Sequence, residues 1–377
     1  MKWCAGSPQP YYWPTVETRG TVTAGTISVA VINHNGQAYV AGALEAVARL
    51  GSSVAEVLLV DSGSTDDSVA TVRRQFPNVN VIELGDNRGP GAARNAAIRA
   101  AARDRVLLID NDAEPQPGCP EALAAALDDH PRAVLAMPAV LYADAADTVQ
   151  YAGAEPHFLG AAALLEADTP VARLPDGVRR VGSAITCCVL VDRRHLGDRL
   201  WFDERMFLYL EDHEFGLRAS LLGFDCLAVP AARCLHGAGT IGLSIRQTGR
   251  FTPGRVRLTI RNRWLTVMMS YQKRTLLRFG PALIAFEVFQ FLGAVRKGWL
   301  GHWLWAAGSA VRAGRYVVHR RGALRAARRR GDMDVLVDGP FPYNKAMHRS
   351  PFERLGRRTL DAVAQLNWRL ASGGRRA

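Results

Sequence analysis

The first 110 residues alternate strand-like apolar runs with segments of helical spacing, and this alternation constrains the fold more than any other feature. The apolar runs and the helical segments between them lie, in chain order, at residues 27–33, 38–50, 54–61, 67–76, 79–84, 91–103 and 105–109. A helix between two strands carries the chain back, so that the strands pair in parallel. The pattern therefore predicts an α/β fold, with a parallel sheet covered by helices on its faces.

Polar residues follow three of these runs directly. They are, in order, Asn33 and Asn35, then Asp61 with Ser62 and Gly63, then Asp110 and Asp112. Open parallel sheets bind ligands at the carboxyl ends of their strands, so we expect these residues to lie near one site. The two carboxylates of the third group suit Mg²⁺ or Mn²⁺ beside a diphosphate. Each group also has an ordinary alternative as a helix cap or a turn.

A glycine-rich segment, residues 85–91, follows the third run and opens a helix. It contains Asn87, Arg88 and Gly89, and Arg94 comes about one turn later. Backbone N–H groups at a helix start, together with a nearby guanidinium, favour a phosphate. The segment matches neither the G-x-G-x-x-G fingerprint nor a Walker loop. A tight turn with a cap is the alternative interpretation.

The pattern changes after Asp112. We expect a helix at 120–129, a strand at 133–140, an irregular stretch to about 180, a strand at 183–192, a helix at 211–223, a short strand at 224–230 and a helical region at 275–311.

The first 25 residues lack the basic start and apolar run of a signal peptide, and no run reaches the ~18 apolar residues of a spanning helix. Six scattered cysteines without CxxC spacing fit a reducing compartment. We therefore expect a cytoplasmic protein.

Five segments together resemble a family 2 glycosyltransferase of the GT-A fold, close to the rhamnosyltransferase-like branch. They are ISVAVINHN, LLVDSGSTDDS, GDNRGPGAARNAAI, LLIDNDAEPQPG and FLYLEDHEFGLRASLLGF. The last resembles the family's Y-x-E-D-x-D-x-x-x-R element through Tyr209, Glu211, Asp212 and Arg218, with Glu214 in place of the usual second Asp. The resemblance covers about residues 27–265 and includes a His-containing strand end at Cys234–Thr240.

The resemblance implies a role for each matching residue. Asp61 would bind the nucleotide, the Asn87–Arg94 loop would contact it, Asp110 and Asp112 would bind the metal with His236 as an additional ligand, and Asp212 would be the catalytic base with Glu211 beside it. An inverting transfer needs one base for the acceptor hydroxyl and a cation for the leaving diphosphate. A glycoside hydrolase would instead need two carboxylates flanking the bond.

Several alternatives remain open. Glu211, Asp212 and Glu214 fit an exposed acidic helix face, with Arg218 as the i+4 partner of Glu214. His236 fits a core or loop histidine. A sugar nucleotidyltransferase would show a G-x-G-T-R-x-x-P-type loop near the first strand, which this sequence lacks. The partial match of Gln247–Phe251 to the QxxRW element of processive synthases is treated as accidental. A catalytically inactive, membrane-associated scaffold of the same fold is the alternative function.

Charge separates the two parts of the chain. Residues 1–245 hold 20 basic and 29 acidic residues, a net of −9, whereas residues 246–377 hold 27 basic and 6 acidic, a net of +21. The helical region up to residue 311 is amphipathic and contains Trp299, Trp303 and Trp305. Basic and aromatic composition favours an anionic membrane surface, and helices that close the catalytic domain are the equal alternative. No nucleic-acid-binding module is visible, so no nucleic acid is expected.

The sequence thus predicts a loosely structured segment 1–25, a Rossmann-like GT-A catalytic domain 26–265 and a basic, amphipathic helical region 266–377. We expect an inverting, metal-dependent transferase that uses a UDP- or dTDP-sugar with Mg²⁺ or Mn²⁺. The expected acceptor is a glycan or a polyprenyl-linked glycan, in cell-wall polysaccharide or glycolipid assembly. The expected location is the cytoplasm or the inner face of the cell membrane.

Overall fold

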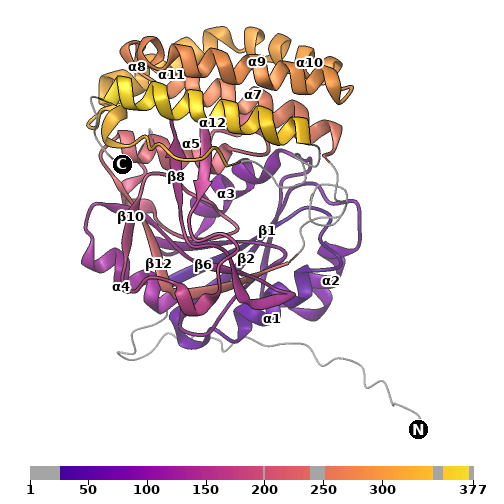
Figure 1. The fold of residues 1–377 in the computed structure, drawn as a ribbon. Helices are drawn as coiled ribbons and strands as arrows, with labels where there is room; N and C mark the ends of the chain where they lie inside the picture. Colours follow the sequence, from indigo (N-terminus) through magenta and orange to yellow (C-terminus); the bar gives the residue numbers. More distant parts are fainter. Residues whose placement is uncertain (1–25, 198–199, 238–250, 343–350, 373–377) are drawn as a thin grey trace.

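The computed structural model describes residues 26–197, 200–237, 251–342 and 351–372. These residues form a large mixed sheet with helices on both faces, and a layer of helices lies across one end of it (Figure 1). The predicted segment 1–25 and most of Gln247–Phe251 lie outside the described residues.

Ten strands form the large sheet, and a two-stranded sheet lies apart. The strands of the large sheet are β1 (Ile27–Asn33), β2 (Val54–Asp61), β3 (Asn80–Glu83), β4 (Arg105–Asp110), β5 (Ala113–Pro115), β6 (Ala133–Tyr142), β7 (Ala145–Tyr151), β10 (Arg179–Val181), β11 (Cys188–Asp192) and β12 (Asp225–His236). The small sheet is β8 (Ala154–His157) with β9 (Ala161–Leu164).

The parallel half of the sheet confirms the alternation in the sequence. Its order is β4-β1-β2-β3, and every pair in it is parallel. On the other side, β11 runs antiparallel to both β4 and β6, and β6 is parallel to β12. The carboxyl ends of β1, β2 and β4 therefore lie together along one edge of the sheet.

Helices cover both faces because apolar residues alternate to either side of the strands. One core contains side chains of α1 (Val40–Ala48), α2 (Ser68–Gln75) and α4 (Cys119–Asp129). The opposite core contains side chains of α3 (Gly89–Ala100) and α5 (Glu211–Leu221). The sheet is thus buried on both faces, as expected for strands that are almost continuously apolar.

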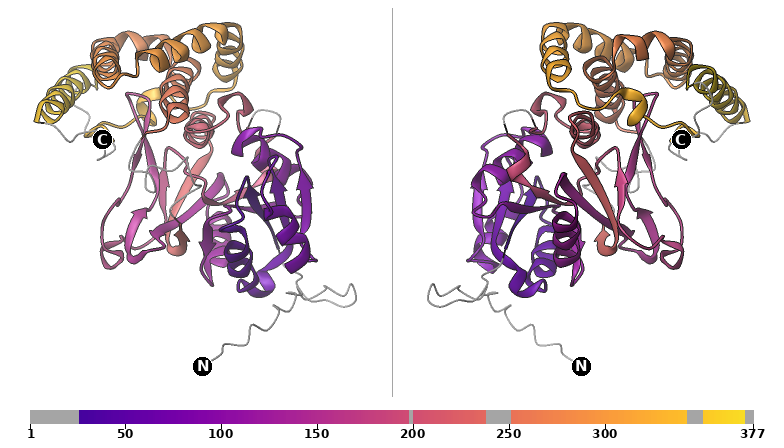
Figure 2. Two further views of the ribbon diagram at one scale, coloured as in Figure 1. Left: turned by 90° about the vertical axis from the view of Figure 1, so that its right-hand side faces the viewer. Right: turned by 90° about the vertical axis from the view of Figure 1, so that its left-hand side faces the viewer.

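Six helices of the described residues form the layer across the end of the sheet, which we call the helical layer. They are α7 (Pro253–Ser270), α8 (Lys273–Arg278), α9 (Gly280–Arg296), α10 (Leu300–Arg312), α11 (Gly314–Ala327) and α12 (Pro351–Ser372). Phe158 packs against Phe279 and Trp368, with ring centroids 4.9 and 5.2 Å away. The inner side of the layer is therefore packed on the part of the protein that contains the sheet, as one of the two interpretations of this region required, and Figure 2 shows it seated at that end.

The structure differs from the sequence prediction in three places. The stretch 141–180 contains β7, β8, β9 and the start of β10, which the sequence analysis took as irregular. The strand predicted at 183–192 begins at Cys188, and the one predicted at 224–230 continues to His236. The helical region 275–311 is interrupted after α9, where Gly298 has a φ of 71°. Each helix within the described ranges is too short or too polar to cross a membrane.

Candidate active site

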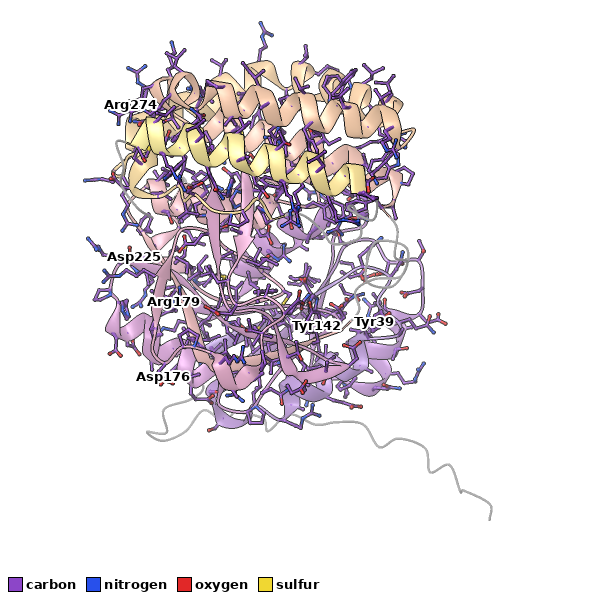
Figure 3. All side chains as sticks on the ribbon, viewed as in Figure 1. Tyr39, Tyr142, Asp176, Arg179, Asp225 and Arg274 are labelled. Carbon is purple, nitrogen blue, oxygen red and sulfur yellow. The ribbon has the colours of Figure 1, made fainter. Side chains whose placement is uncertain are left out.

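A cleft of about 2450 Å³ opens between the carboxyl-end edge of the sheet and the helical layer. One end is lined by loops that follow β1, β2 and β4, including Asn33, Ser62 and Asp110. The other end is lined by side chains of α7, α9 and α12, such as Arg263 and Phe286. Tyr142, labelled in Figure 3, lines the cleft on the side of β6.

The ends of β1 and β2 are joined by a buried hydrogen-bond network. The Asn33 side-chain amide donates to Asp61 Oδ1 at 2.7 Å and to Ser68 Oγ at 2.9 Å. Asn111 Nδ2 donates to Asn33 Oδ1 at 2.9 Å, which extends the network to the end of β4. Asp61 is 2% exposed and also accepts from the backbone N–H of Ser64. Asp61 therefore stabilises the loop from inside the protein, and the buried Asn33 and Asn111 line the cleft.

The glycine-rich segment approaches the loop before α5 very closely. Gly89 has a φ of 81°, and a Cβ atom there would meet the carbonyl oxygen of Phe207 at 2.2 Å. The backbone N–H of Arg88 donates to Ser62 Oγ at 3.0 Å. Asn87 and Gly89 line the cleft, whereas the Arg88 guanidinium points to Glu204, with Nη2 3.0 Å from Oε2. Glycine is required at position 89 by both its backbone conformation and the lack of space.

Arg94, in the first turns of α3, joins two groups of carboxylates. Its Nη2 donates to Asp110 Oδ1 at 2.8 Å, and its Nη1 donates to Glu211 Oε1 at 3.1 Å. The guanidinium is 4% exposed. Burial lowers the pKa of Arg94, but Asp110 and Glu211 outweigh this effect and raise it. Arg94 therefore carries a permanent positive charge between the end of β4 and the start of α5.

Asp112 and His236 face one another at the end of β12. Strand β12 pairs with β5 so that His236 lies opposite Ala113, and this register brings the histidine next to Asp112. His236 Nε2 lies 3.4 Å from Asp112 Oδ1, and Nδ1 lies 2.8 Å from Gln150 Oε1. Burial lowers the pKa of His236, but its neighbours, Cys187 and Asp112 among them, outweigh this effect and raise it, so Nε2 can carry the proton that faces the carboxylate. A divalent cation that displaced this proton would lie between the same two atoms.

The acidic pair begins α5 directly after a strained loop. Phe207, Tyr209 and Leu210 all have φ values between 64° and 68°, which non-glycine residues rarely adopt. The Asn262 side-chain amide of α7 lies within 3.0 Å of the carbonyl oxygens of Met206, Leu208 and Tyr209. Strain of this kind persists only where the surroundings hold it, and such residues gather at functional sites. Here α7 of the helical layer holds the loop that presents the acidic pair.

Glu211 is buried, and Asp212 reaches the cleft. Burial and the neighbouring Asp212 raise the pKa of Glu211 to about 7, against the opposing effect of Arg94. Burial also raises the pKa of Asp212, again opposed by Arg94. Asp212 Oδ1 accepts from the backbone N–H of His213 at 2.7 Å. One of the two carboxyls can therefore hold a proton near neutral pH, as proton transfer to and from an acceptor requires.

The acidic helix face expected under the alternative interpretation is not exposed. Glu214 does pair with Arg218, with Oε1 2.8 Å from Nε, but Glu211, Glu214 and Arg218 are each less than 5% exposed. The i+4 pair therefore lies inside the protein and anchors α5.

Most of the predicted site residues meet in the one cleft. Those that line it are Asn33, Asn35, Ser62, Asn87, Gly89, Arg94, Asp110, Asp112, Glu211, Asp212 and His236. Asp61, Gly63 and Arg88 are not among its lining residues. No three His, Cys, Asp or Glu side chains in the described part of the chain form a ready metal site. Asp110 is paired with Arg94, so Asp112 and His236 are the members of the predicted metal set that face each other.

The sequence analysis missed four residues that line the cleft or hold the loop before α5. Asn111 lies between Asp110 and Asp112, and this position next to two predicted site residues was the one signal that could have identified it. Gln150 lies in the stretch taken as irregular, which carries no motif. Asn262 and Arg255 lie on α7, where neither belonged to a motif that we interpreted; the Arg255 guanidinium lies 4.4 Å from the ring centroid of Tyr209. Their roles depend on contacts between segments far apart in the chain.

Comparison with known proteins shows which family and which relatives part of the chain resembles. Residues 28–167 match the model of the family described as Glycosyl transferase family 2. N-acetylglucosaminyl-diphospho-decaprenol L-rhamnosyltransferase of Mycobacterium tuberculosis is 31% identical over 202 residues. This match covers 48% of the present chain and 66%, just under two thirds, of the relative.

Two further similarities are more limited. Poly(ribitol-phosphate) beta-N-acetylglucosaminyltransferase TarS of Staphylococcus aureus is 33% identical over 113 residues, which cover 29% of this chain and 20% of TarS. The crystal structure of GalNAc-T7 with UDP, GalNAc and Mn²⁺ superposes with a TM-score of 0.55 at 14% identity, covering 77% of this chain and 57% of that one. At this identity the likeness shows a shared GT-A fold.

Proposed function

We infer that this chain, which belongs to glycosyl transferase family 2 and to its rhamnosyltransferase-like branch, transfers a sugar from a nucleotide-diphosphate donor to an acceptor hydroxyl. The observation that carries the proposal is the convergence of Asp112, His236 and Asp212 on one cleft with the polar ends of β1 and β2. A nucleotide site, a cation site and a base are the three parts that such a transfer needs. The proposed catalytic unit, residues 26–265, ends inside α7.

The donor nucleotide is proposed to bind at the sheet edge. Asn35 is exposed there, the buried Asn33 and Ser62 line the same space, and Asn87 and Gly89 present the glycine-rich segment to it. Asp61 acts through Asn33, which it orients by the 2.7 Å hydrogen bond. We expect a UDP- or dTDP-sugar. GalNAc-T7, whose fold is shared, is described with UDP and Mn²⁺.

A divalent cation fits the residues next to the proposed diphosphate. Asp112 Oδ1 and His236 Nε2 could hold Mg²⁺ or Mn²⁺ between them, with Asp110 close by on the same turn. Diphosphate oxygens would complete its ligands, as is usual for Mg²⁺. When bound, the cation stabilises negative charge on the departing nucleotide diphosphate. Gln150 fixes the orientation of the His236 ring, and Arg94 fixes Asp110.

Asp212 is proposed as the base that removes the proton from the acceptor hydroxyl. The hydroxyl oxygen then attacks the anomeric carbon of the sugar while the bond to the diphosphate oxygen breaks on the opposite face, so the configuration inverts. Glu211, buried beside it, raises the proton affinity of the acidic pair, and Arg94 limits that rise. One base and a separate cation site suffice, because the leaving group needs no second carboxyl acid.

The acceptor is proposed to enter from the helical layer. That end of the cleft combines apolar side chains, Phe286, Phe289 and Trp299, with the charged Arg255 and Arg357. A glycan on a polyprenyl diphosphate carries both an apolar tail and anionic phosphates, and therefore fits this lining. The rhamnosyltransferase relative is named for a diphospho-decaprenol acceptor. We place the protein in cell-surface polysaccharide or glycolipid assembly on this basis.

Donor binding tests the proposal. Purified protein is heated with Mn²⁺ and each of a panel of UDP-, dTDP- and GDP-sugars, and slow donor hydrolysis is followed in parallel. One donor class should raise the melting temperature only when the metal is present, and Asp112→Ala should lose this shift. Glu114→Ala, two residues later and half-exposed, is the matched control. Absence of binding with every donor and metal would favour the inactive scaffold.

A further inference from the structure

Exposed apolar side chains are concentrated on the helical layer. Among the described residues 17 large apolar side chains are exposed, and 15 of them belong to α8–α12. They are Leu277, Ile284, Val288, Phe291, Leu292, Val295, Leu300, Leu304, Trp305, Val311, Val318, Leu355, Val363, Leu366 and Leu370. Scattered single apolar residues need no explanation, but a concentration on one layer indicates an interaction surface.

Helical spacing shows that these side chains form faces directed away from the core. On α9, Ile284, Val288 and Val295 lie on the side opposite the buried Phe286. On α12, Leu355, Leu366 and Leu370 are exposed, while Leu360, Ala364 and Trp368 face the protein. The layer therefore has apolar side chains on two sides, one used for packing and one left uncovered. We call the second side the outer face, and Figure 3 shows side chains projecting from it.

The exposed surface of residues 251–342 and 351–372 is also strongly basic. Its exposed Lys and Arg residues are Lys273, Arg274, Arg278, Arg296, Arg312, Arg315, Arg325, Arg329, Arg354, Arg358 and Arg369. Within residues 251–342 and 351–372 the only exposed acidic side chain is Asp334. Helices that combine apolar and basic exposed residues bind in the plane of an anionic membrane surface.

We propose that the outer face of α9, α10 and α12 docks on an anionic lipid bilayer. The apolar side chains would enter the boundary between headgroups and acyl chains, and the arginines would contact lipid phosphates. Charge complementarity selects this occupant over a second copy of the chain. On the described residues of these three helices the exposed charged side chains are Arg296, Arg312, Arg354, Arg358 and Arg369, and none is acidic, so two copies joined by this face would bring like charges together.

The docking surface is continuous with the cleft. Leu292 and Val295 are 60% and 48% exposed on α9, and both also line the cleft. A lipid-linked acceptor in the bilayer could therefore pass its head group into the cleft without leaving the membrane. This last step rests on the proposed transferase function, whereas the docking itself does not.

Vesicle co-sedimentation tests the docking. The full chain is mixed with vesicles of phosphatidylcholine alone or of phosphatidylcholine with phosphatidylglycerol, at low and high salt. We expect binding to the anionic vesicles, weakened by salt. Arg312→Gln with Arg369→Gln should weaken binding by about fivefold for each charge removed. Ile284→Ser with Val288→Ser should weaken it by about tenfold. Arg74→Gln and Val178→Ser, on the exposed surface of the catalytic unit, are the matched controls.

Each outcome decides the inference. The inference is supported when the full chain pellets with anionic vesicles, both double variants pellet less, and the two controls pellet as the wild type does. Failure of the full chain to bind either vesicle, or binding that the α9 variant leaves unchanged, overturns it. A concentration-dependent dimer that Ile284→Ser with Val288→Ser dissociates would assign the face to self-association instead. Donor-dependent thermal stabilisation is measured on the same variants, so loss of docking and failure of the proposed function are distinguished.

Discussion

Arg94 and Glu211 form an ion pair that is buried on both sides, with Nη1 3.1 Å from Oε1. The two residues lie 117 positions apart in the chain. Because Arg94 also bonds Asp110, a single guanidinium sets the spacing between the end of β4 and the acidic pair at the start of α5. The proposed cation region and the proposed base are therefore coupled through one charge.

Replacement of this guanidinium should destabilise the protein. Arg94→Gln leaves Glu211 and Asp110 without their partner, and breaking a buried pair costs about 3–5 kcal/mol. Denaturant unfolding measures the change in free energy. Arg73→Gln is the matched control, because the Arg73–Glu83 pair is half-exposed on both sides and such pairs contribute about 0–1 kcal/mol. An equal, small loss in both variants would show that the Arg94 pair has no special structural role.

Replacement of Asn262 should impair catalysis more than donor binding. Asn262→Ala removes the hydrogen bonds that hold Met206, Leu208 and Tyr209, so the strained loop before Glu211 can relax and move Asp212. Misplacement of a catalytic group by about 1 Å costs on the order of 100-fold in rate. Steady-state kinetics should show a fall of about 10–100-fold in kcat with little change in the donor KM.

Asn367→Ala is the control for this variant. Asn367 also bridges helix ends through its amide, but it joins α12 to α8 and α9, away from the cleft. If Asn367→Ala reduced kcat as much as Asn262→Ala, general loosening of the helical layer would explain both. A fall in donor affinity without a fall in kcat would also contradict the positioning role.

Local sequence pattern was sufficient for the parallel half of the sheet, because each strand there is a continuous apolar run ended by polar residues. Because the carboxyl ends of parallel strands lie at the same edge of a sheet, the pattern also predicted that Asn33 and Asp110 lie close together. It failed for β7–β9, since these strands are short and separated by turns at Gly153 and Gly160, both with positive φ. A stretch with mixed burial and frequent turns lacks the period of two on which strand prediction depends.

The limits of the site prediction have a similar cause. Asp61 and Asp212 resemble each other in sequence as acidic residues at element ends, yet Asp61 is enclosed by Asn33 and Ser64 whereas Asp212 reaches the cleft. The enclosure of Asp61 depends on Asn33, which is 28 residues away, as well as on nearby Ser64, and no local pattern encodes the distant contact. The buried Arg94 pairs and the Asn262 contact were invisible for the same reason.

Two substitutions separate the roles of the acidic pair. Asp212→Asn keeps the side-chain shape but removes the base, so kcat should fall about 10²–10⁴-fold while donor-induced thermal stabilisation persists. Glu211→Gln keeps a hydrogen-bonding group for Arg94 but alters the charge beside Asp212, so its kcat should fall less. The opposite order, with Glu211→Gln the more damaged enzyme, would transfer the role of base to Glu211.

The acidic pair should also determine the pH dependence of the rate. Burial and the proximity of Asp212 raise the pKa of Glu211 to about 7, and burial raises that of Asp212. The base must be unprotonated, so kcat/KM should fall as pH drops through about 7, because the pair then gains a proton. A rate profile measured at saturating metal checks this. A rate that stays level down to pH values near the ordinary carboxyl pKa would contradict the raised proton affinity of the pair.

Buried histidines should make the folded state sensitive to acid. His157 donates from Nε2 to the carbonyl oxygen of Gly339 at 3.0 Å and accepts at Nδ1 from the Leu159 N–H at 3.2 Å, so the ring is neutral and fully bonded. Burial lowers its pKa from 6.5 to about 4. Between these values the unfolded chain binds the additional proton, so the free energy of unfolding falls as pH decreases from 6.5 to 4, by about 1.4 kcal/mol per pH unit.

His157→Gln isolates this contribution. Glutamine can still donate to the carbonyl oxygen of Gly339 but does not titrate, so the variant should lose less stability than the wild type between pH 6.5 and pH 4. The measurement is the difference between the two proteins in free energy of unfolding, because Glu211 affects both proteins equally and in the opposite sense. Its pKa is raised to about 7, so the folded state binds its proton first and is stabilised as pH falls through 7. His319→Gln, on the exposed side of α11, is the matched control. Identical slopes for His157→Gln and the wild type would mean that protonation of the ring is not what unfolds the protein in acid.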